Sequence, residues 1–286
     1  MAHPSDMLSL PLELIREIIE LVAYDAIGQD LAWVASALVV VSRDIRAWVH
    51  PILYHTIHIH LHNDEALLRL LDSKPSEFFA PVRHIILVDC FPGTRIAQRC
   101  LARLPKVKTF TVDDEGFQAL KTQYMNIRAR RIIMTFAAEP GVLNGRPFEP
   151  VTHLRLLLWR DFGLDWSYRF SKMPRLSHIV FDLWAASTVS ILEVNVRAAL
   201  AAPSCQRVVV QVIDQDSKDE EEANQRYVTV IKVLRLFKDS RVYAARVHNR
   251  HLGEMTLRMT LDSHARTCAR EALQGADPWS IGERVM

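Results

Sequence analysis

The sequence predicts an α/β protein in which a small helical bundle precedes a curved sheet of parallel strands with helices on its outer side. Two observations predict this: apolar stripes of helical period in the first sixty residues, and short apolar strands that recur at regular intervals afterwards. With 286 residues, 49% of them hydrophobic, the chain can form a large core. We expect a helical domain over residues 8–60, an α/β domain over 61–262 and a helical tail over 263–286.

The first helix is expected to begin at Leu10 or Pro11. Proline is tolerated at the first helical position because its missing N–H would be unpaired there, and Glu13 in the first turn complements the helix dipole. The apolar i, i+3, i+4, i+7 template then occurs three times, at Ile15, Ile18, Ile19 and Val22, at Leu31, Val34, Ala35 and Leu38, and at Ile45, Trp48, Val49 and Ile52.

Three such short helices cannot bury all of their apolar surface. The first helix has further large apolar residues outside its main stripe, at Leu10, Leu12, Leu14 and Leu21. Two interpretations remain open: the second domain covers this surplus, or a helix of a partner protein does.

Residues 10–19, LPLELIREII, resemble the opening of an F-box, in which Leu-Pro precedes a short amphipathic helix. Residues 39–43, 48–49 and 51–54 resemble the later F-box helices, especially those of F-box-like proteins abundant in fungi. The stretch 25–30 is short and holds Gly28, and residues 39–41 are more β-branched than a helix prefers. Both features depart from the usual pattern.

The resemblance implies a substrate-recognition adaptor of an SCF-type cullin-RING ubiquitin ligase. F-box helices bind a Skp-type adaptor, which links them to a cullin, and they perform no chemistry. Transferred to this sequence, the adaptor-binding residues are Leu10, Pro11, Leu14, Ile15, Ile18, Leu38, Val41 and Trp48.

The rest of the chain shows an irregular repeat. Residues 105–112 align without gaps to residues 174–181, and residues 81–88 to residues 150–157. The first inward residues of the predicted strands are Ile85, Phe110, Ile132, Leu154, Ile179 and Val208, at intervals of 25, 22, 22, 25 and 29 residues. Helix-compatible segments lie between the strands, for example at 96–104, 185–201 and 223–237, and a strand near 241–247 is expected to close the stack.

These intervals resemble leucine-rich-repeat spacing and imply an irregular horseshoe. The Asn or Cys that such repeats place in the turn after the strand has only Cys90 as a match, since Glu115, Trp159 and Trp184 occupy the other positions. A doubly wound open α/β sheet is the alternative fold. Neither GxGxxG nor GxxxxGK[ST] supports it with a nucleotide-binding loop.

Alternation along the strands identifies the residues that face away from the helices. We expect a protein target to bind this face, through His84, Ile86, Thr109, Thr111, His153, Arg155, His178 and Val180. A merely solvated strand face is the competing interpretation. At the level of the whole protein, the competing function is an interaction scaffold outside the ubiquitin system, with the F-box-like helices packed on the repeats.

Composition and motifs favour protein partners over chemistry. The net charge of +2 provides no field for nucleic acid, and no segment is apolar enough to span a membrane. The four widely spaced cysteines suit reduced thiols in the cytoplasm or nucleus. His58, His60 and His62 alternate on one strand, where the outer pair is too far apart to share a metal ion. We therefore expect no cofactor, no metal and no enzymatic activity, and a hydrolase on an open sheet has no candidate nucleophile motif.

Overall fold

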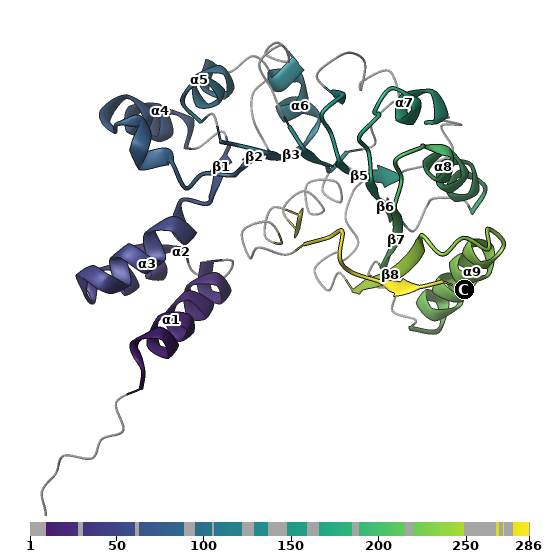
Figure 1. Ribbon diagram of the computed structural model, residues 1–286, viewed down its shortest axis with the longest axis horizontal. Helices are drawn as coiled ribbons and strands as arrows, with labels where there is room; N and C mark the ends of the chain where they lie inside the picture. Colours follow the sequence, from purple (N-terminus) through teal and green to yellow (C-terminus); the bar gives the residue numbers. More distant parts are fainter. Residues whose placement is uncertain are drawn as a thin grey trace, which may run out of the picture.

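The computed structural model describes residues 10–27, 31–60, 63–88, 95–104, 106–121, 129–136, 148–158, 166–184, 189–214, 220–248, 267–268, 271 and 277–285. It shows a mixed α/β protein built around a nine-stranded sheet that is almost entirely parallel. The sheet curves into an arc, and the N-terminal helices lie beyond its first strand (Figure 1).

The N-terminal bundle consists of α1 (Leu12–Ile27), α2 (Leu31–Ser36), a 3-10 turn η1 (Leu38–Val40) and α3 (Arg43–Leu53). The carbonyl of Pro11 accepts hydrogen bonds from the N–H groups of Leu14 and Ile15, so α1 begins just after the proline. The β-branched stretch at residues 39–41 leaves the α-helical geometry, as its composition predicts. Ser42 caps α3, its Oγ accepting a hydrogen bond from the Ile45 N–H at 3.1 Å.

A small apolar core holds these helices together, made of Ala23, Val34, Leu38, Val49 and Ile52. On α1 the side facing this core follows Ile19, Ala23 and Ala26, which are spaced at i, i+4 and i+7. Of the predicted stripe Ile15, Ile18, Ile19 and Val22, only Ile19 packs against this core, and the other three are exposed. Glu13, Arg16, Glu17 and Glu20 form a polar stripe on α1, but the remaining apolar surface is wider than the bundle core can cover, so periodicity alone could not select its buried part.

The strands follow one another across the sheet in chain order, from β1 to β9. Their bounds are β1 Thr56–Ile59, β2 His84–Leu87, β3 Thr109–Val112, β4 Arg131–Met134, β5 His153–Leu158, β6 His178–Leu183, β7 Arg207–Asp214, β8 Val242–His248 and β9 Glu283–Arg284. Neighbours from β1 to β8 pair in parallel, whereas β9 pairs antiparallel with β8.

The predicted strand register is confirmed at every step. The six predicted inward residues stand opposite one another, with the pairs Ile85↔Phe110, Phe110↔Ile132, Ile132↔Leu154, Leu154↔Ile179 and Ile179↔Val208. Ile57 and Val242 extend the row at its two ends. The sequential order also shows that the doubly wound alternative is wrong, because such a sheet reverses its strand order at a switch point.

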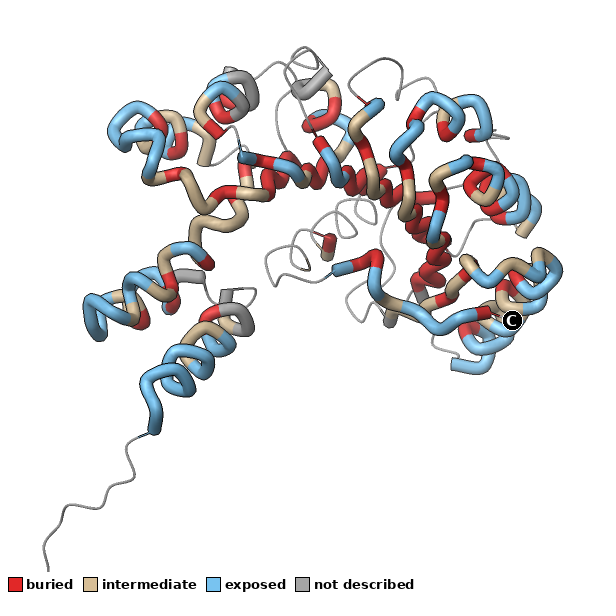
Figure 2. The backbone as a smooth tube through the Cα atoms, viewed as in Figure 1, coloured by how far each residue is buried: buried red, intermediate tan, exposed pale blue. Residues whose placement is uncertain are grey.

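Helices connect the strands along the convex side of the arc (Figure 1). They are α4 Asp64–Ser73, a 3-10 turn η2 Ser76–Phe79, α5 Arg95–Arg103, α6 Asp114–Lys121, α7 Ser167–Ser171, α8 Val189–Ala201 and α9 Glu220–Arg235. The main core lies between them and the sheet, where the inward strand residues meet Leu71 of α4, Val196 of α8 and Leu234 of α9. Figure 2 shows this buried band running along the whole arc.

The two acidic clusters of the sequence lie at helix starts. Asp114 and Glu115 are in the first turn of α6, and residues 220–222 are in the first turn of α9. Asp113 caps α6 by accepting the Gly116 N–H at 2.7 Å. A Cβ on Gly116 would overlap the Leu87 carbonyl oxygen, so this glycine lets α6 lie directly against the end of β2.

The C-terminal segment differs from the expected helical tail. Residues 267–268 and 271 are helical, but residues 277–280 form a turn and β9 follows it. The Val285 N–H then donates to the Val242 carbonyl at 3.0 Å. The tail therefore ends as an edge strand, because the exposed side of β8 still has unpaired backbone groups to satisfy. Nowhere in the described ranges is there a helix with the length and apolar character needed to cross a membrane.

Candidate protein-interaction sites

The first candidate site is the apolar side of α1 that faces away from the bundle core. Seven large apolar side chains on α1 or just before it are exposed, with Leu21 at 62%: Leu10, Leu12, Leu14, Ile15, Ile18, Leu21 and Val22. Much of α1 is drawn as exposed in Figure 2. Isolated exposed leucines are common on proteins, whereas a run along three turns of one helix is typical of an interaction surface.

Most of the predicted adaptor-binding residues lie on this surface or near it. Leu10, Pro11, Leu14, Ile15 and Ile18 share the exposed side of α1. Of the three later residues, Val41 is 66% exposed, Trp48 is half-buried and Leu38 is only 6% exposed.

Leu38 therefore belongs to the bundle core and offers no exposed side chain to a partner. Sequence reasoning missed two exposed residues, Trp33 and Val40. The β-branched run at residues 39–41 did not single out Val40, because Val39 of the same run packs against the bundle core.

The end of α3, not α1, touches the sheet domain. The Phe78 ring of η2 lies 5.3 Å from the His50 ring and 4.7 Å from the Tyr54 ring, both as edge contacts. Lys74 adds a cation–π contact to Phe78. The bundle is thus attached through one aromatic cluster, and α1 is left accessible on the far side of the bundle (Figure 1).

The second candidate site is the concave face of the sheet, where the target-binding residues were predicted. Five of them are buried, His84, Ile86, Thr111, Arg155 and Val180, and three are half-buried, Thr109, His153 and His178. The expectation that this face is open is therefore not met. The chain's own C-terminal segment lies over it, with Cys268 and Trp279 contacting Ile133, Val180 and Val209.

A buried ion-pair network forms the centre of the concave face. The Arg155 guanidinium binds Asp182 of the neighbouring strand and Glu271 of the C-terminal segment, both at 2.7 Å. Burial alone would lower the pKa of Arg155, but the Asp182 and Glu271 carboxylates raise it well above its usual value. Arg155 therefore stays charged and joins the C-terminal segment to the sheet.

An aromatic cluster lies beside this network. The His153 and His178 rings stack with centroids 4.4 Å apart, and the Trp279 indole meets the His153 ring edge-on at 5.0 Å. The Arg131 guanidinium lies over the same indole at 5.3 Å. Burial, followed by the charges of His178 and Arg131, lowers the pKa of His153 to about 4, so the ring is neutral at pH 7.

Two further contacts complete the concave face. Arg207 lies 3.6 Å from the Tyr243 ring and donates hydrogen bonds to the carbonyls of Ser280 and Ile281 at 3.2 and 2.8 Å. His84 hydrogen-bonds the Thr111 hydroxyl at 2.8 Å, and burial lowers its pKa to about 3. Arg207 thus fixes the backbone of the C-terminal segment beside Trp279.

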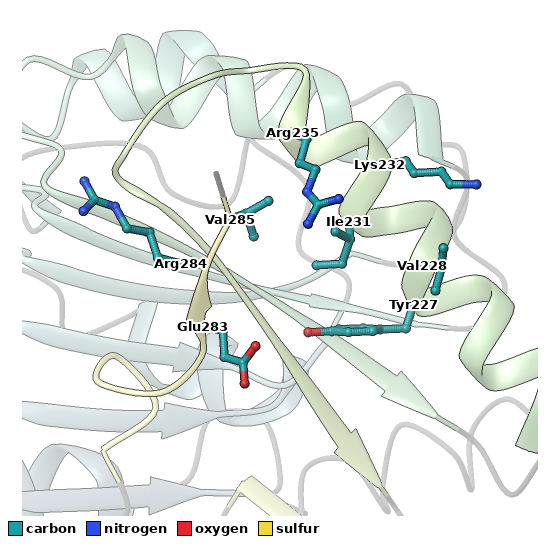
Figure 3. Close-up of a pocket in the computed structure, with 8 residues that line it drawn as sticks. All are labelled: Tyr227, Val228, Ile231, Lys232, Arg235, Glu283, Arg284 and Val285. Carbon is teal, nitrogen blue, oxygen red and sulfur yellow. The ribbon is translucent and has the colours of Figure 1, made fainter.

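A pocket of about 360 Å³ lies between α9 and the C-terminal strand, and Figure 3 shows the residues that line it. Its lining residues are Tyr227, Val228, Ile231, Lys232, Arg235, Glu283, Arg284 and Val285. Three cations stand against one carboxylate around an apolar floor. This composition suits contact with another molecule's surface and contains no pair of nucleophile and base.

The described residues offer little for catalysis. Burial raises the pKa of the Cys100 thiol to about 12, which leaves it protonated and unreactive. His58 and His60 lie close together with ring centroids 4.9 Å apart, while His62 lies outside the described residues. No group of three His, Cys, Asp or Glu side chains suited to a metal ion is found in the described part of the chain.

No known protein family, curated protein or solved structure shows a significant match to this chain.

Proposed function

We propose that the chain is an F-box-like substrate-recognition adaptor of a cullin-RING ubiquitin ligase. The N-terminal bundle would bind a Skp-type adaptor and, through it, a cullin. The sheet domain, as an irregular leucine-rich-repeat-like horseshoe, would bind the protein to be ubiquitylated. No catalytic residue of its own is required, because the adaptor only brings its target to the ligase.

One observation carries the proposal: the Leu-Pro helix leaves an apolar stripe exposed while the opposite side of the same helix is buried. Leu14, Ile18 and Leu21 lie on one side of α1, and Ile19 and Ala23 pack into the bundle core on the other. A helix with two apolar sides is expected where one side belongs to the fold and the second to a partner helix or groove.

The arrangement of the sheet domain also supports the proposal. The strands follow one another in chain order with a nearly constant register, and the described helices lie on the convex side. Stacked strand–helix units of this kind form extended concave binding surfaces. In the scaffold alternative, the apolar stripe of α1 would pack on the repeats. The leucines of this stripe are instead exposed, and no described part of the chain covers them.

Binding to a purified Skp-type adaptor tests the proposal. The intact protein should form a stable complex, and Leu14→Ala combined with Ile18→Ala should weaken it at least tenfold, because each truncation of a central apolar contact commonly costs more than about 1 kcal/mol. A matched control is Leu236→Ala, which removes an exposed leucine of the sheet domain. Absence of a complex with the intact, folded protein would refute the adaptor function.

A further inference from the structure

Described residues of the C-terminal segment, at 267–268, 271 and 277–281, lie on the face on which a target was expected. Between residues 267 and 281 its described contacts with the sheet are made by side chains rather than by strand pairing, which is confined to β9. The two main anchors are chemically distinct. Trp279 inserts its ring beside His153 and Arg131, and Glu271 pairs with Arg155.

This mode of attachment matches that of a bound peptide. An aromatic side chain fills an apolar depression lined by Ile133, Val180 and Val209, and a carboxylate binds a buried guanidinium. Trp279 is buried, and buried aromatic anchors of this type carry much of the affinity in protein interfaces, whereas Glu271 is 28% exposed. These contacts indicate that the concave face can bind one aromatic side chain and one carboxylate.

The same contacts can be released without leaving an isolated buried charge. Arg155 keeps its 2.7 Å bond to Asp182 when Glu271 departs, because both partners belong to adjacent strands of the sheet. Removing one member of a buried pair is costly when the other is left alone, and that situation does not arise here.

The fit of the C-terminal segment is also incomplete. Within the described chain, the buried Trp279 Nε1–H and the buried Gln211 Oε1 have no hydrogen-bond partner. Gln211 lies on the concave face one strand away from Asp182. Displacement of the segment would return the Trp279 N–H to water and leave Gln211 Oε1 free to accept a hydrogen bond. A ligand with a donor at this point would therefore make a contact that the segment does not make.

We infer that the concave face between β4 and β8 is a peptide-binding surface for a segment with one aromatic side chain and one carboxylate, and that the C-terminal segment is its displaceable intramolecular occupant. The inference rests on the proposed function only in taking the concave face as the target surface. A target would then compete with the chain's own residues 267–285, which lowers its apparent affinity until the segment is displaced.

A fluorescent peptide with the sequence of residues 267–285 tests this on the full chain. The variant carrying Trp279→Ala and Glu271→Gln should bind the peptide at least tenfold more tightly than the unmodified chain, because its own segment competes less well. A peptide with the same two substitutions should not bind. The control chain carries Trp33→Ala and Glu193→Gln, which alter an exposed tryptophan and glutamate elsewhere, and should behave like the unmodified chain.

Hydrogen exchange on the unmodified chain decides the question if the double variant fails to fold. Backbone amides in residues 267–281 should exchange at least a hundredfold faster than those in β5 to β7, because the segment detaches while the sheet stays folded. Exchange of both regions only through global unfolding would overturn the inference, as would a folded double variant that does not bind the peptide. Neither measurement uses the Skp-type adaptor. Failure of this inference can therefore be distinguished from failure of the proposed adaptor function.

Discussion

The N-terminal bundle and the concave face of the sheet differ in which side chains they expose and which they bury. The bundle exposes leucines and isoleucines along α1, whereas the concave face buries an arginine, an aspartate and a histidine. A bundle with a core of five buried residues has too little interior to enclose a helix that is apolar on two sides. The long sheet has a second face, and a segment distant in sequence can cover it.

The difference shows that hydrophobicity alone does not indicate which surface is buried. The apolar side of α1 is accessible because nothing in the described chain reaches it. Arg155 and Asp182 are enclosed because each satisfies the other and Glu271 completes the network. The exposed apolar side of α1 and the covered polar concave face are therefore both candidate surfaces for binding a partner.

The largest expected change in stability comes from breaking a buried ion pair, which is compared with breaking an exposed one. Asp182→Ala should lower the free energy of unfolding by about 3–5 kcal/mol, because it removes the fully buried carboxylate that neutralises Arg155 and leaves only Glu271, whose side chain is 28% exposed. Asp72→Ala breaks the Arg99–Asp72 pair, whose side chains are both more than half exposed. It should change the free energy of unfolding by less than about 1 kcal/mol. Urea unfolding followed by circular dichroism measures both. Equal losses would show that the concave face is hydrated.

A matched pair of leucines compares the two regions directly. Leu154→Ala in β5 should cost about 2–5 kcal/mol of stability, because the side chain is fully buried in the main core. Leu21→Ala removes the same atoms from the exposed side of α1 and should change stability by about 0.5 kcal/mol or less. The same unfolding measurement applies. A large loss for Leu21→Ala would mean that α1 packs on the remainder of the chain after all.

The buried histidine predicts a pH dependence. The pKa of His84 is 6.5 in the unfolded chain and about 3 in the fold, mainly because burial disfavours its charged form. Between these values the unfolded state binds more protons, so stability is fully present above pH 6.5 and falls as pH decreases. The contribution is roughly 1 kcal/mol per pH unit in that window.

Unfolding at a series of pH values, compared between variants, isolates this contribution. The double variant His84→Leu with Thr111→Val should lose that part of the slope, and Thr111→Val alone should keep it because the histidine remains. An unchanged slope in the double variant would show that His84 is protonated in the folded protein.

The smallest expected effect lies in the bundle. Ser42→Ala removes the side-chain acceptor at the start of α3 and should destabilise the bundle by about 1 kcal/mol, whereas Ser42→Thr should retain most of the cap. Because α3 attaches the bundle to Phe78, the loss should be visible as faster hydrogen exchange in α3 with no change in β5 to β7. Faster exchange throughout the chain would indicate that bundle and sheet unfold together.

Local pattern was sufficient to predict much of the fold. The strand register from Ile85 to Val208 and the helices on the convex side follow from alternation and spacing. The same reasoning missed α4 and placed Leu38 on the adaptor surface. Of its predicted stripe on α1, only Ile19 packs against the bundle core, because the apolar surface of this helix is wider than the part that the core covers.

The sequence by itself determined the strands from β2 to β8 in their order and the residues that face one another across them. Those features depend on periodicity within a few residues and on repeats about 25 residues apart. Only the tertiary structure decided which surfaces are accessible. Burial of the concave face depends on contacts such as Arg155 with Glu271 and His153 with Trp279, which join residues more than a hundred positions apart. No local pattern encodes such pairs, because each side chain acquires its environment only when the chain has folded.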